Sequence, residues 1–333
     1  MPTRCDRVVV LAALLLLPAL LLAQDYPATR ISNGVVTAEL YLPDALHGSY
    51  RATRFDWSGI VRSLTFQGHG YFGQWYDTHD PLANDAITGP VNVFDSPGPP
   101  TSYAEAKTGG TFLRIGVGHL EKPEEPAYRE SSLYKIVDPG TWHVDRKPDS
   151  VRFTHELPAR NGYGYVYVKT VALSHGKAVM VLSQELKNTG SKPLDVPVYN
   201  HGFFQIDQEP AGPGLVWSFP FPPRTKQDFG GMAEIRDRRI AYVRELQPGE
   251  RSMAQIEGFG ESARDYHFVL ENLKTGAGVR VSGDHPIEKM TFWSRRMGYS
   301  PEVTIRLRIP PGESRRWETR YEFYVASNGK KGS

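Results

Sequence analysis

Short runs of β-forming residues separated by turn residues restrict the fold of this chain more than any other feature. Residues alternate with a period of two in Tyr163–Leu173 and again in Val303–Ile309, and that period is typical of strands. Turn sequences such as Pro248-Gly249 and Pro311-Gly312 lie between runs. The runs expected to form strands are Val35–Tyr41, Gly59–Phe66, Thr111–Val117, Val151–Thr154, Tyr163–Leu173, Ala178–Glu185, Asp195–Tyr199, Val216–Phe219, His267–Glu271, Gly278–Ser282, Lys289–Trp293, Val303–Ile309 and Arg316–Val325.

Helical periodicity is weak throughout, and only Pro123–Tyr134 and Glu257–Arg264 have room for a short helix. Many strands joined by Gly- and Pro-containing turns predict an all-β fold, a large antiparallel β-sandwich. Sandwiches of roughly 200–250 residues occur as single domains, and no Ser- or Gly-rich linker divides the 333 residues. We therefore expect one domain over residues 24–333.

The first residues have the pattern of a targeting segment. Arg4 and Arg7 precede the apolar run Val8–Leu22, and Ala23 is a small residue before polar sequence. The run is short and contains Pro18, which favours a signal peptide over residues 1–23, with an uncleaved anchor as the alternative. Cleavage would place the protein in the periplasm or outside the cell, without a stable membrane anchor.

Cysteine and charge exclude several classes of function. The only cysteine, Cys5, lies in the predicted signal peptide, so the mature chain has no disulfide, catalytic thiolate or Cys-ligated metal. His69, His79 and Asp80 lack a recognised ligand spacing, and we expect no metal and no cofactor. The formal net charge is +2 and basic residues are interspersed with acidic ones, so no nucleic-acid partner is expected.

The segment Tyr199–Asp207 carries the most distinctive chemistry. Aromatic residues, Phe204 among them, can form an apolar floor for a sugar ring, while Asn200, His201 and Asp207 supply polar groups. The alternative is structural, with Asn200 capping a turn and His201 buried and hydrogen-bonded.

Asn200-His201-Gly202-Phe203-Phe204 resembles the Asn-His-x-Tyr/Phe-Phe motif of galactose mutarotases. In that family, the galactose mutarotase-like (aldose 1-epimerase) superfamily, the histidine is the general acid. The C-terminal order is also similar to the family's: Trp293 on a strand, Glu302 in place of the catalytic base, the turn Pro311–Glu313, and a last strand containing Tyr321-Glu-Phe323. The resemblance extends over residues 30–326.

The resemblance implies a β supersandwich that binds a sugar or oligosaccharide in an open groove lined by Asn200, His201, Trp293 and Glu302. Opening an aldose ring needs a base at the anomeric hydroxyl and an acid at the ring oxygen. By the resemblance Glu302 is the base and His201 the acid, on opposite sides of the acetal.

Two departures from the family pattern leave the activity open. Thr108 stands where galactose mutarotases have the histidine of a His-Gly-Gly motif, and Gly89–Asn92 lacks the arginine of their Gly-Arg-x-x-Asn-Arg segment. His119 is a candidate replacement, although it is equally typical of a surface residue at a strand end. The groove either takes a different sugar or only binds one.

Further candidates come from Arg54-Phe55-Asp56-Trp57 and from Trp75-Tyr76-Asp77. An indole can stack on a sugar face while Arg54 holds hydroxyl groups; the alternative is a core aromatic beside a structural ion pair. Lys169 faces either the groove or solvent.

Three functions fit these observations. The favoured one is an exported aldose 1-epimerase-like isomerase that uses His201 and Glu302. The second is a non-catalytic carbohydrate-binding β-sandwich, and the third is a sandwich related to polysaccharide-degrading enzymes. Fold alone does not distinguish them.

The signal peptide is tested by the N-terminus of the exported protein. N-terminal sequencing is expected to begin at Gln24, because cleavage follows the small residue Ala23. An intact Met1 in the membrane fraction would instead establish an anchor.

Overall fold

The computed structural model describes residues 26–326, so the predicted signal peptide lies outside the described residues. Every pair of strands is antiparallel, and the described residues form no α-helix. The all-β antiparallel prediction is confirmed. The two short helices are not formed: Pro123–Tyr134 is turn and bend, because Pro126 lacks an amide donor, and Glu257–Arg264 holds only the start of the 3₁₀ turn η2 (Ala263–Asp265).

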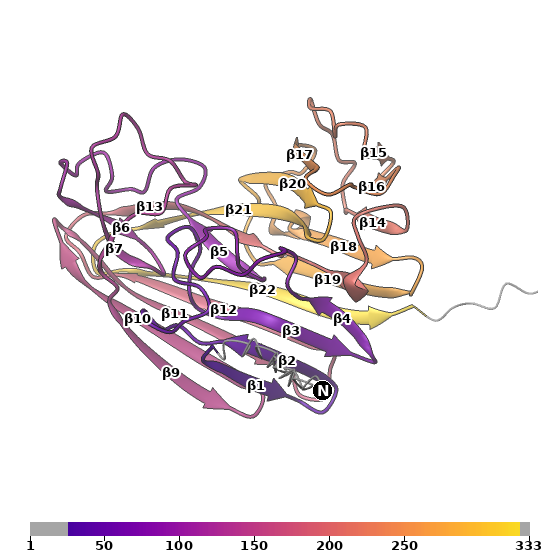
Figure 1. Cartoon of the computed structure of the whole chain (residues 1–333), viewed down its shortest axis with the longest axis horizontal. Coiled ribbons are helices and arrows are strands. Elements are labelled where there is room, and N and C mark those ends of the chain that lie inside the picture. The colour runs from indigo at the N-terminus through magenta and orange to yellow at the C-terminus, as the bar shows by residue number, and fades with distance from the viewer. Residues whose placement is uncertain (1–25, 327–333) are drawn as a thin grey trace, which may run out of the picture.

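One large curved sheet forms the first layer (Figure 1). Its strands, in spatial order, are β15 (Ala233–Arg236), β16 (Arg239–Tyr242), β14 (Leu215–Ser218), β18 (His267–Asn272), β19 (Ala277–Gly283), β22 (Ser314–Val325), β12 (Val179–Asn188), β11 (Tyr163–Leu173), β10 (Ser150–Arg160) and β9 (Thr141–Lys147). The alternating run Tyr163–Leu173 forms β11, one of the longest of these strands.

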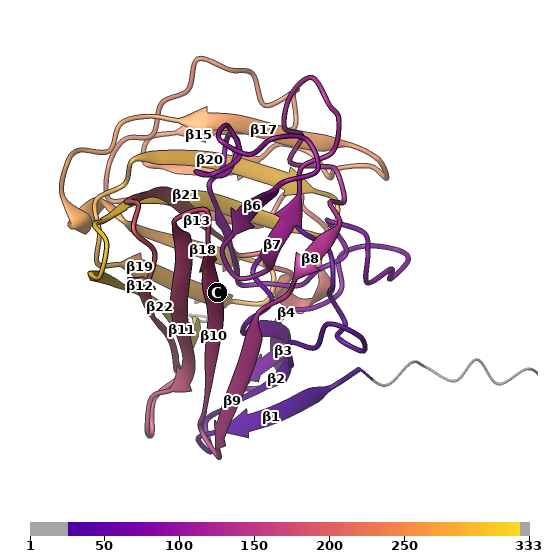
Figure 2. The ribbon, with the colours of Figure 1, turned by 90° about the vertical axis from the view of Figure 1, so that its left-hand side faces the viewer.

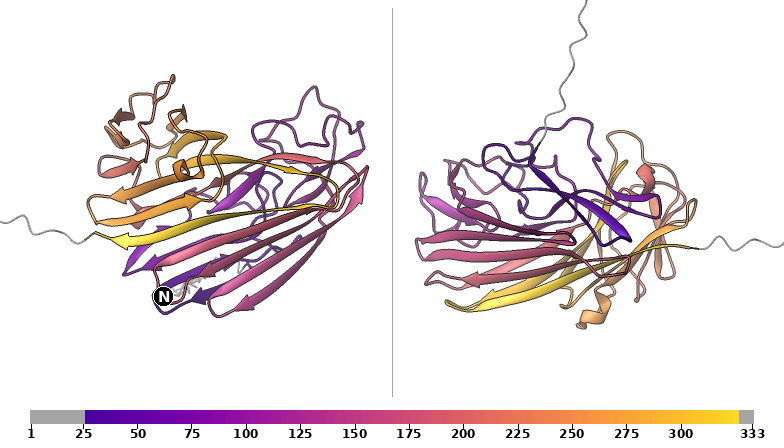
Figure 3. Two further views of the ribbon diagram at one scale, coloured as in Figure 1. Left: turned by 180° about the vertical axis from the view of Figure 1, so that it is seen from behind. Right: turned by 90° about the horizontal axis from the view of Figure 1, so that it is seen from below.

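Two smaller sheets form the second layer (Figures 1 and 3). One comprises β17 (Arg251–Ile256), β20 (Lys289–Arg295), β21 (Tyr299–Ile309), β13 (Leu194–His201) and β5 (Val91–Phe94); the other comprises β1 (Ala28–Ser32), β2 (Val36–Tyr41), β3 (Ile60–Phe66) and β4 (His69–Phe72). Phe204 bridges them through backbone pairing with Phe72 and Tyr299. A cluster of buried side chains from both layers fills the space between them.

A fourth, short sheet of β6 (Thr111–Arg114), β7 (Gly118–Glu121) and β8 (Ile136–Asp138) accompanies long loops at one end of the sandwich (Figure 2). These loops have their own apolar cluster, which includes Phe55, Trp57, Tyr103 and Phe112 and reaches Tyr199 on β13. The loops are therefore packed against the five-stranded sheet by buried aromatic surface.

A buried ion pair anchors the loop that follows Arg54. Lys169 Nζ lies 3.3 Å from Asp56 Oδ2, and both side chains are fully buried. The Tyr167 hydroxyl donates to the same carboxylate at 3.0 Å, and Ser58 Oγ donates at 2.8 Å. Lys169 thus faces neither groove nor solvent, because a buried charge is retained where it is paired and hydrogen-bonded. Asp56 and Trp57 therefore have a structural role, as the ion-paired carboxylate and the core aromatic that were the alternative to sugar binding.

No helix among residues 26–326 has the length and apolar character to cross a membrane. The same residues contain no group of three or more His, Cys, Asp or Glu side chains placed to hold a metal ion.

A buried histidine on β10 makes the stability of the fold sensitive to pH. The His155 ring stacks on Trp142 with a centroid distance of 4.0 Å, Nε2–H donates to the Pro139 carbonyl, and Nδ1 accepts from the Tyr165 hydroxyl. Burial lowers the pKa of this imidazole from 6.5 to about 4. As the pH falls from 6.5 to 4, the unfolded chain gains a proton that the folded chain does not, so the folded state loses about 3 kcal/mol.

We expect urea unfolding to show His155→Gln as less stable than the wild type at pH 7, with a smaller further loss on acidification to pH 4.5. His143→Gln, an exposed substitution on the adjacent strand β9, serves as the matched control and should follow the wild-type pH dependence. An unchanged acid loss in His155→Gln would contradict this assignment.

Candidate active site

A pocket of about 270 Å³ opens on the face of the five-stranded sheet that points away from the core. Its volume is near the lower end of small-molecule sites, roughly 300–1,000 Å³. Alternate residues of four strands line it, since side chains on a strand alternate between faces. The strand residues are Tyr199, His201, Arg251, Met253, Lys289, Thr291, Trp293, Arg295, Glu302 and Thr304; loops add Arg54, Trp75, Asp85, Ser96, Pro97, Glu130 and Phe203.

The register of β13 against β21 brings His201 to Glu302. Asn200 pairs with Val303, so the next residues along each strand, His201 and Glu302, face one another on the pocket side. His201 Nε2 lies 3.2 Å from Glu302 Oε1. The two groups are in direct contact, which differs from the expected arrangement on opposite sides of a bound sugar.

Aromatic rings enclose the His201 imidazole. It stacks on Phe203 with a centroid distance of 3.5 Å and meets the Trp293 ring edge-on at 4.7 Å. Phe203 adopts a positive φ of 44°, a conformation that costs about 1–3 kcal/mol for a non-glycine residue. Gly202 is required beside it, because a Cβ there would lie 2.3 Å from the Phe204 ring.

Burial and Glu302 have opposite effects on the pKa of His201. The side chain is 2 % exposed and that of Glu302 is 14 % exposed. Burial, the larger effect, lowers the pKa of His201, while the hydrogen bond and charge of Glu302 raise it. Nδ1 is buried without a hydrogen-bond partner among the described residues. His201 therefore favours the neutral form more than a free imidazole does, and Glu302 is the first of the groups that favour its protonation.

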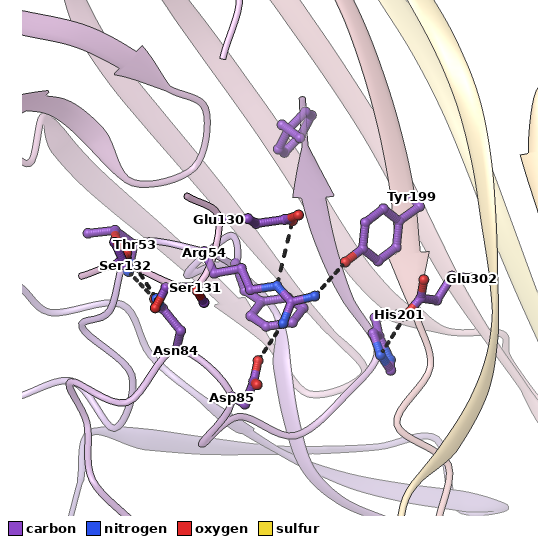
Figure 4. Close-up of polar contacts among 12 residues, drawn as sticks. Thr53, Arg54, Asn84, Asp85, Glu130, Ser131, Ser132, Tyr199, His201 and Glu302 are labelled. Carbon is purple, nitrogen blue, oxygen red and sulfur yellow. Dashed lines mark hydrogen bonds and ion pairs between the residues drawn. The ribbon is translucent and has the colours of Figure 1, made fainter. Parts of the chain in front are cut away.

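Arg54 lies at the opposite wall and joins three oxygen-bearing side chains (Figure 4). Its Nη1 donates to Asp85 Oδ1 at 2.5 Å, its Nη2 donates to the Tyr199 hydroxyl at 3.2 Å, and its Nε lies 3.6 Å from Glu130 Oε1. Burial raises the pKa of Tyr199, which Arg54 opposes, so the hydroxyl stays protonated.

Backbone contacts hold the loops that carry these groups. Asn84 Oδ1 accepts from the Thr53 amide at 3.1 Å, and Asn84 Nδ2 donates to the Ser132 carbonyl at 3.0 Å (Figure 4). The buried Arg114 donates to the Arg54 carbonyl at 2.7 Å. Three separate loops are thereby fixed around one guanidinium.

The structure brings together five of the candidate residues, Arg54, Trp75, His201, Trp293 and Glu302, and leaves the other predicted binding residues outside the pocket. Asn200 faces the core, because it is one residue from His201 on a strand; its Nδ2 donates to Asn92 Oδ1 and its Oδ1 accepts from the Tyr321 hydroxyl. The predicted groove lining was therefore wrong for Asn200.

Three more predicted binding residues have other contacts. Phe204 is fully buried where the two smaller sheets meet. Asp207 pairs with His69 Nδ1 at 3.0 Å, and His119, 1 % exposed, contacts the Pro158 carbonyl through Nε2 at 2.9 Å. None of the three lines the pocket.

Sequence reasoning missed the basic residues of the pocket and the acidic partners of Arg54. Lys289 and Arg295 alternate with Trp293 along β20, so a period of two counted from Trp293 would have placed them on the same face. Asp85 and Glu130 lie on loops, where no periodic pattern identifies them.

Asn200 provides a test of this geometry. We expect Asn200→Ala to lower the free energy of unfolding by about 1–3 kcal/mol, because it leaves buried partners on Asn92 and Tyr321 unpaired. Urea denaturation measures this loss, and sugar affinity of the folded protein should stay within about twofold of the wild type. Wild-type stability combined with lost sugar binding would place Asn200 back in the pocket.

Comparison with known proteins identifies the architecture. No protein-family model and no curated protein sequence matches the chain. Among solved structures, a protein from Synechocystis sp. PCC 6803 matches with a TM-score of 0.53 and 12 % identity, covering 91 % of this chain and 98 % of its own. The GalM/aldose epimerase homologue from C. elegans matches with a TM-score of 0.52 and 13 % identity, covering 91 % and 100 %.

A galactose mutarotase-like protein from Lactobacillus casei also matches with a TM-score of 0.52 and 13 % identity, covering 89 % of this chain and 100 % of its own. At such low identity the likeness defines the fold rather than the activity. The chain has the galactose mutarotase-like fold. Its sequence is only 13 % identical to these two structures, in agreement with the divergent membership that its altered motifs predict.

Proposed function

We propose that the pocket binds an aldose with its anomeric carbon over His201 and Glu302, and that the protein interconverts the anomers of that sugar. The observation that carries the proposal is the 3.2 Å contact between His201 Nε2 and Glu302 Oε1 on the floor of a pocket walled by aromatic rings. An acid–base pair at the base of a pocket with aromatic walls and a few polar groups is typical of proton-transfer catalysis.

In the proposed reaction the Glu302 carboxylate takes the proton of the anomeric hydroxyl, and His201 in its imidazolium form, which Glu302 favours, gives a proton to the ring oxygen and becomes neutral imidazole. The bond between the anomeric carbon and the ring oxygen breaks, and the aldehyde forms. Rotation about the adjacent carbon–carbon bond and the reverse proton transfers then close the ring as the other anomer. The anomeric and ring oxygens share one carbon, so neighbouring acid and base groups can serve both.

The surrounding side chains suit a sugar ring. Trp75 stacks on Phe203 with a centroid distance of 5.3 Å and meets Trp293 edge-on at 5.3 Å, which gives apolar surface for the C–H face of a pyranose. Arg54 and Tyr199 supply donors for its hydroxyl groups. With the predicted signal peptide, the proposed activity belongs in the periplasm or outside the cell.

The alternative is carbohydrate binding without catalysis, and two observations favour it. His201 is the single histidine among the pocket-lining residues, and Thr108 lies exposed on a turn. All three polar contacts of the Arg54 guanidinium are with protein oxygens, so a sugar hydroxyl would compete with these partners.

Substitution of the acid and base distinguishes the two functions. We expect Glu302→Gln and His201→Asn each to slow mutarotation by about 10²-fold or more, because both proton transfers belong to one transition state. Trp293→Ala should raise KM more than it lowers kcat, since stacking acts on bound substrate and transition state alike. NMR or polarimetry of freshly dissolved aldoses gives these rates.

Gln255→Ala, an exposed substitution on β17 outside the pocket, is the control and should retain the wild-type rate. If the wild type accelerates no sugar's mutarotation but binds a glycan with an affinity that Glu302→Gln retains, the protein is a binding protein.

A further inference from the structure

One wall of the pocket is basic. Arg251 on β17 and Lys289 and Arg295 on β20 line it from the same face as Trp293. Arg251 and Arg295 are direct cross-strand partners, and like charges directly opposite on one face destabilise a sheet. This pair therefore lowers the stability of the free protein, so a contribution to folding does not explain why two arginines lie opposite one another.

The acidic residues of the pocket do not neutralise this wall. Asp85 and Glu130 contact Arg54, and Glu302 contacts His201. Within residues 26–326, no carboxylate lies within ion-pair distance of Arg251, Lys289 or Arg295. Within the same residues, the Arg295 guanidinium has one hydrogen-bond partner, the Gly249 carbonyl, at 3.2 Å from Nη1.

By contrast, neighbouring arginines outside the pocket are paired. Arg244 holds Glu250 through two donors at 2.7 and 2.9 Å, and Arg296 holds Glu245 at 2.8 Å. The adjoining loops thus supply carboxylate partners to their own arginines, whereas the pocket face of β17 and β20 supplies none to Arg251 and Arg295.

We propose that the sugar bound here is anionic, and that Arg251 and Arg295 hold its carboxylate, sulfate or phosphate group, with Lys289 adding positive charge at the other end of β20. This inference rests on the proposed function for the placement of the anomeric carbon. Thr291 pairs with Glu302, and Arg295 lies four residues further along the strand, about 13 Å between Cα atoms. Arg251, Arg295 and Glu302 line the same pocket, so an anion held by the two arginines lies on the part of the sugar remote from the anomeric carbon.

Guanidinium groups suit this task because their fixed fork of donors matches planar carboxylate and tetrahedral sulfate or phosphate oxygens. Binding would also relieve the repulsion between the two opposed arginines. A neutral sugar forms no such ion pair and relieves no repulsion, so the basic wall favours anionic sugars over neutral ones.

Calorimetry tests the selection directly. Galactose and glucose are compared with their uronates, 6-sulfates and 6-phosphates at low ionic strength. We expect at least one anionic form to bind about tenfold more tightly than its neutral parent, and its identity to distinguish carboxylate, sulfate and phosphate. The preference should shrink in about 0.5 M salt, because these partly exposed charges are screened.

The double variant Arg251→Gln/Arg295→Gln should reduce the anionic-to-neutral affinity ratio to within about twofold, whereas Arg152→Gln, an exposed substitution on the ten-stranded sheet, should keep the wild-type ratio. A thermal melt confirms folding, and removing the opposed charges should not lower Tm. Equal wild-type affinities, or a preference that survives the double variant, would overturn the inference.

Mutarotation rates on the same sugars separate the two proposals. Mutarotation without any anionic preference refutes the basic-wall inference and leaves the proposed function intact. Anionic preference without mutarotation supports the basic wall and refutes catalysis.

Discussion

The pairing of β13 with β21 determines which side chains face the pocket. Asn200 opposite Val303 puts both residues toward the core, and it places His201 and Glu302 together on the other face. A slip of one residue would turn the imidazole inward and expose Asn200, since side chains on a strand alternate. The buried bonds of Asn200 to Asn92 and Tyr321 oppose that slip, because they exist in one register only. Residues that touch no ligand thus fix the acid–base geometry.

The sheet supplies only half of the pocket, and the loops that supply the rest depend on a separate apolar cluster. Phe55 and Trp57 are fully buried in it, while the intervening Asp56 is tied to Lys169 on the ten-stranded sheet. A buried ion pair gives little net stability, but it specifies where this loop lies. Arg54, one residue before Phe55, is thereby directed toward Tyr199. Stability of the loop and geometry of the site arise from the same few residues.

The features that could be predicted from the sequence were the strands, because their alternation is a local pattern. Long alternating runs became long strands, and the motif at His201 together with the later Glu302 selected two side chains that line one pocket, although their direct contact was not predicted. The prediction failed where tertiary contacts decide orientation. Asn200 was grouped with His201 by adjacency, although adjacent strand residues face opposite sides. Phe204 was assigned to the sugar because it is aromatic, yet its backbone joins two sheets. The short strand β17, which carries Arg251, was missed because its six residues alternate among polar and small side chains.

Glu302 raises the pKa of His201, in addition to its proposed role as the base that acts on a sugar. Burial against Phe203 and Trp293 favours the neutral imidazole, and Glu302 is the first of the groups that favour its protonation. A buried neutral ring with its Nε2–H toward the carboxylate leaves Nδ1 as an unpaired acceptor, which costs less than an unpaired buried charge. The acid step needs the imidazolium, which Glu302 favours: when the carboxylate takes a proton from a sugar hydroxyl, the imidazolium gives one to the ring oxygen, and the ion pair becomes a neutral carboxylic acid and a neutral imidazole, so no net charge accumulates in the pocket. Acid and base therefore work as one unit, in which removing the carboxylate removes the base and also weakens the acid.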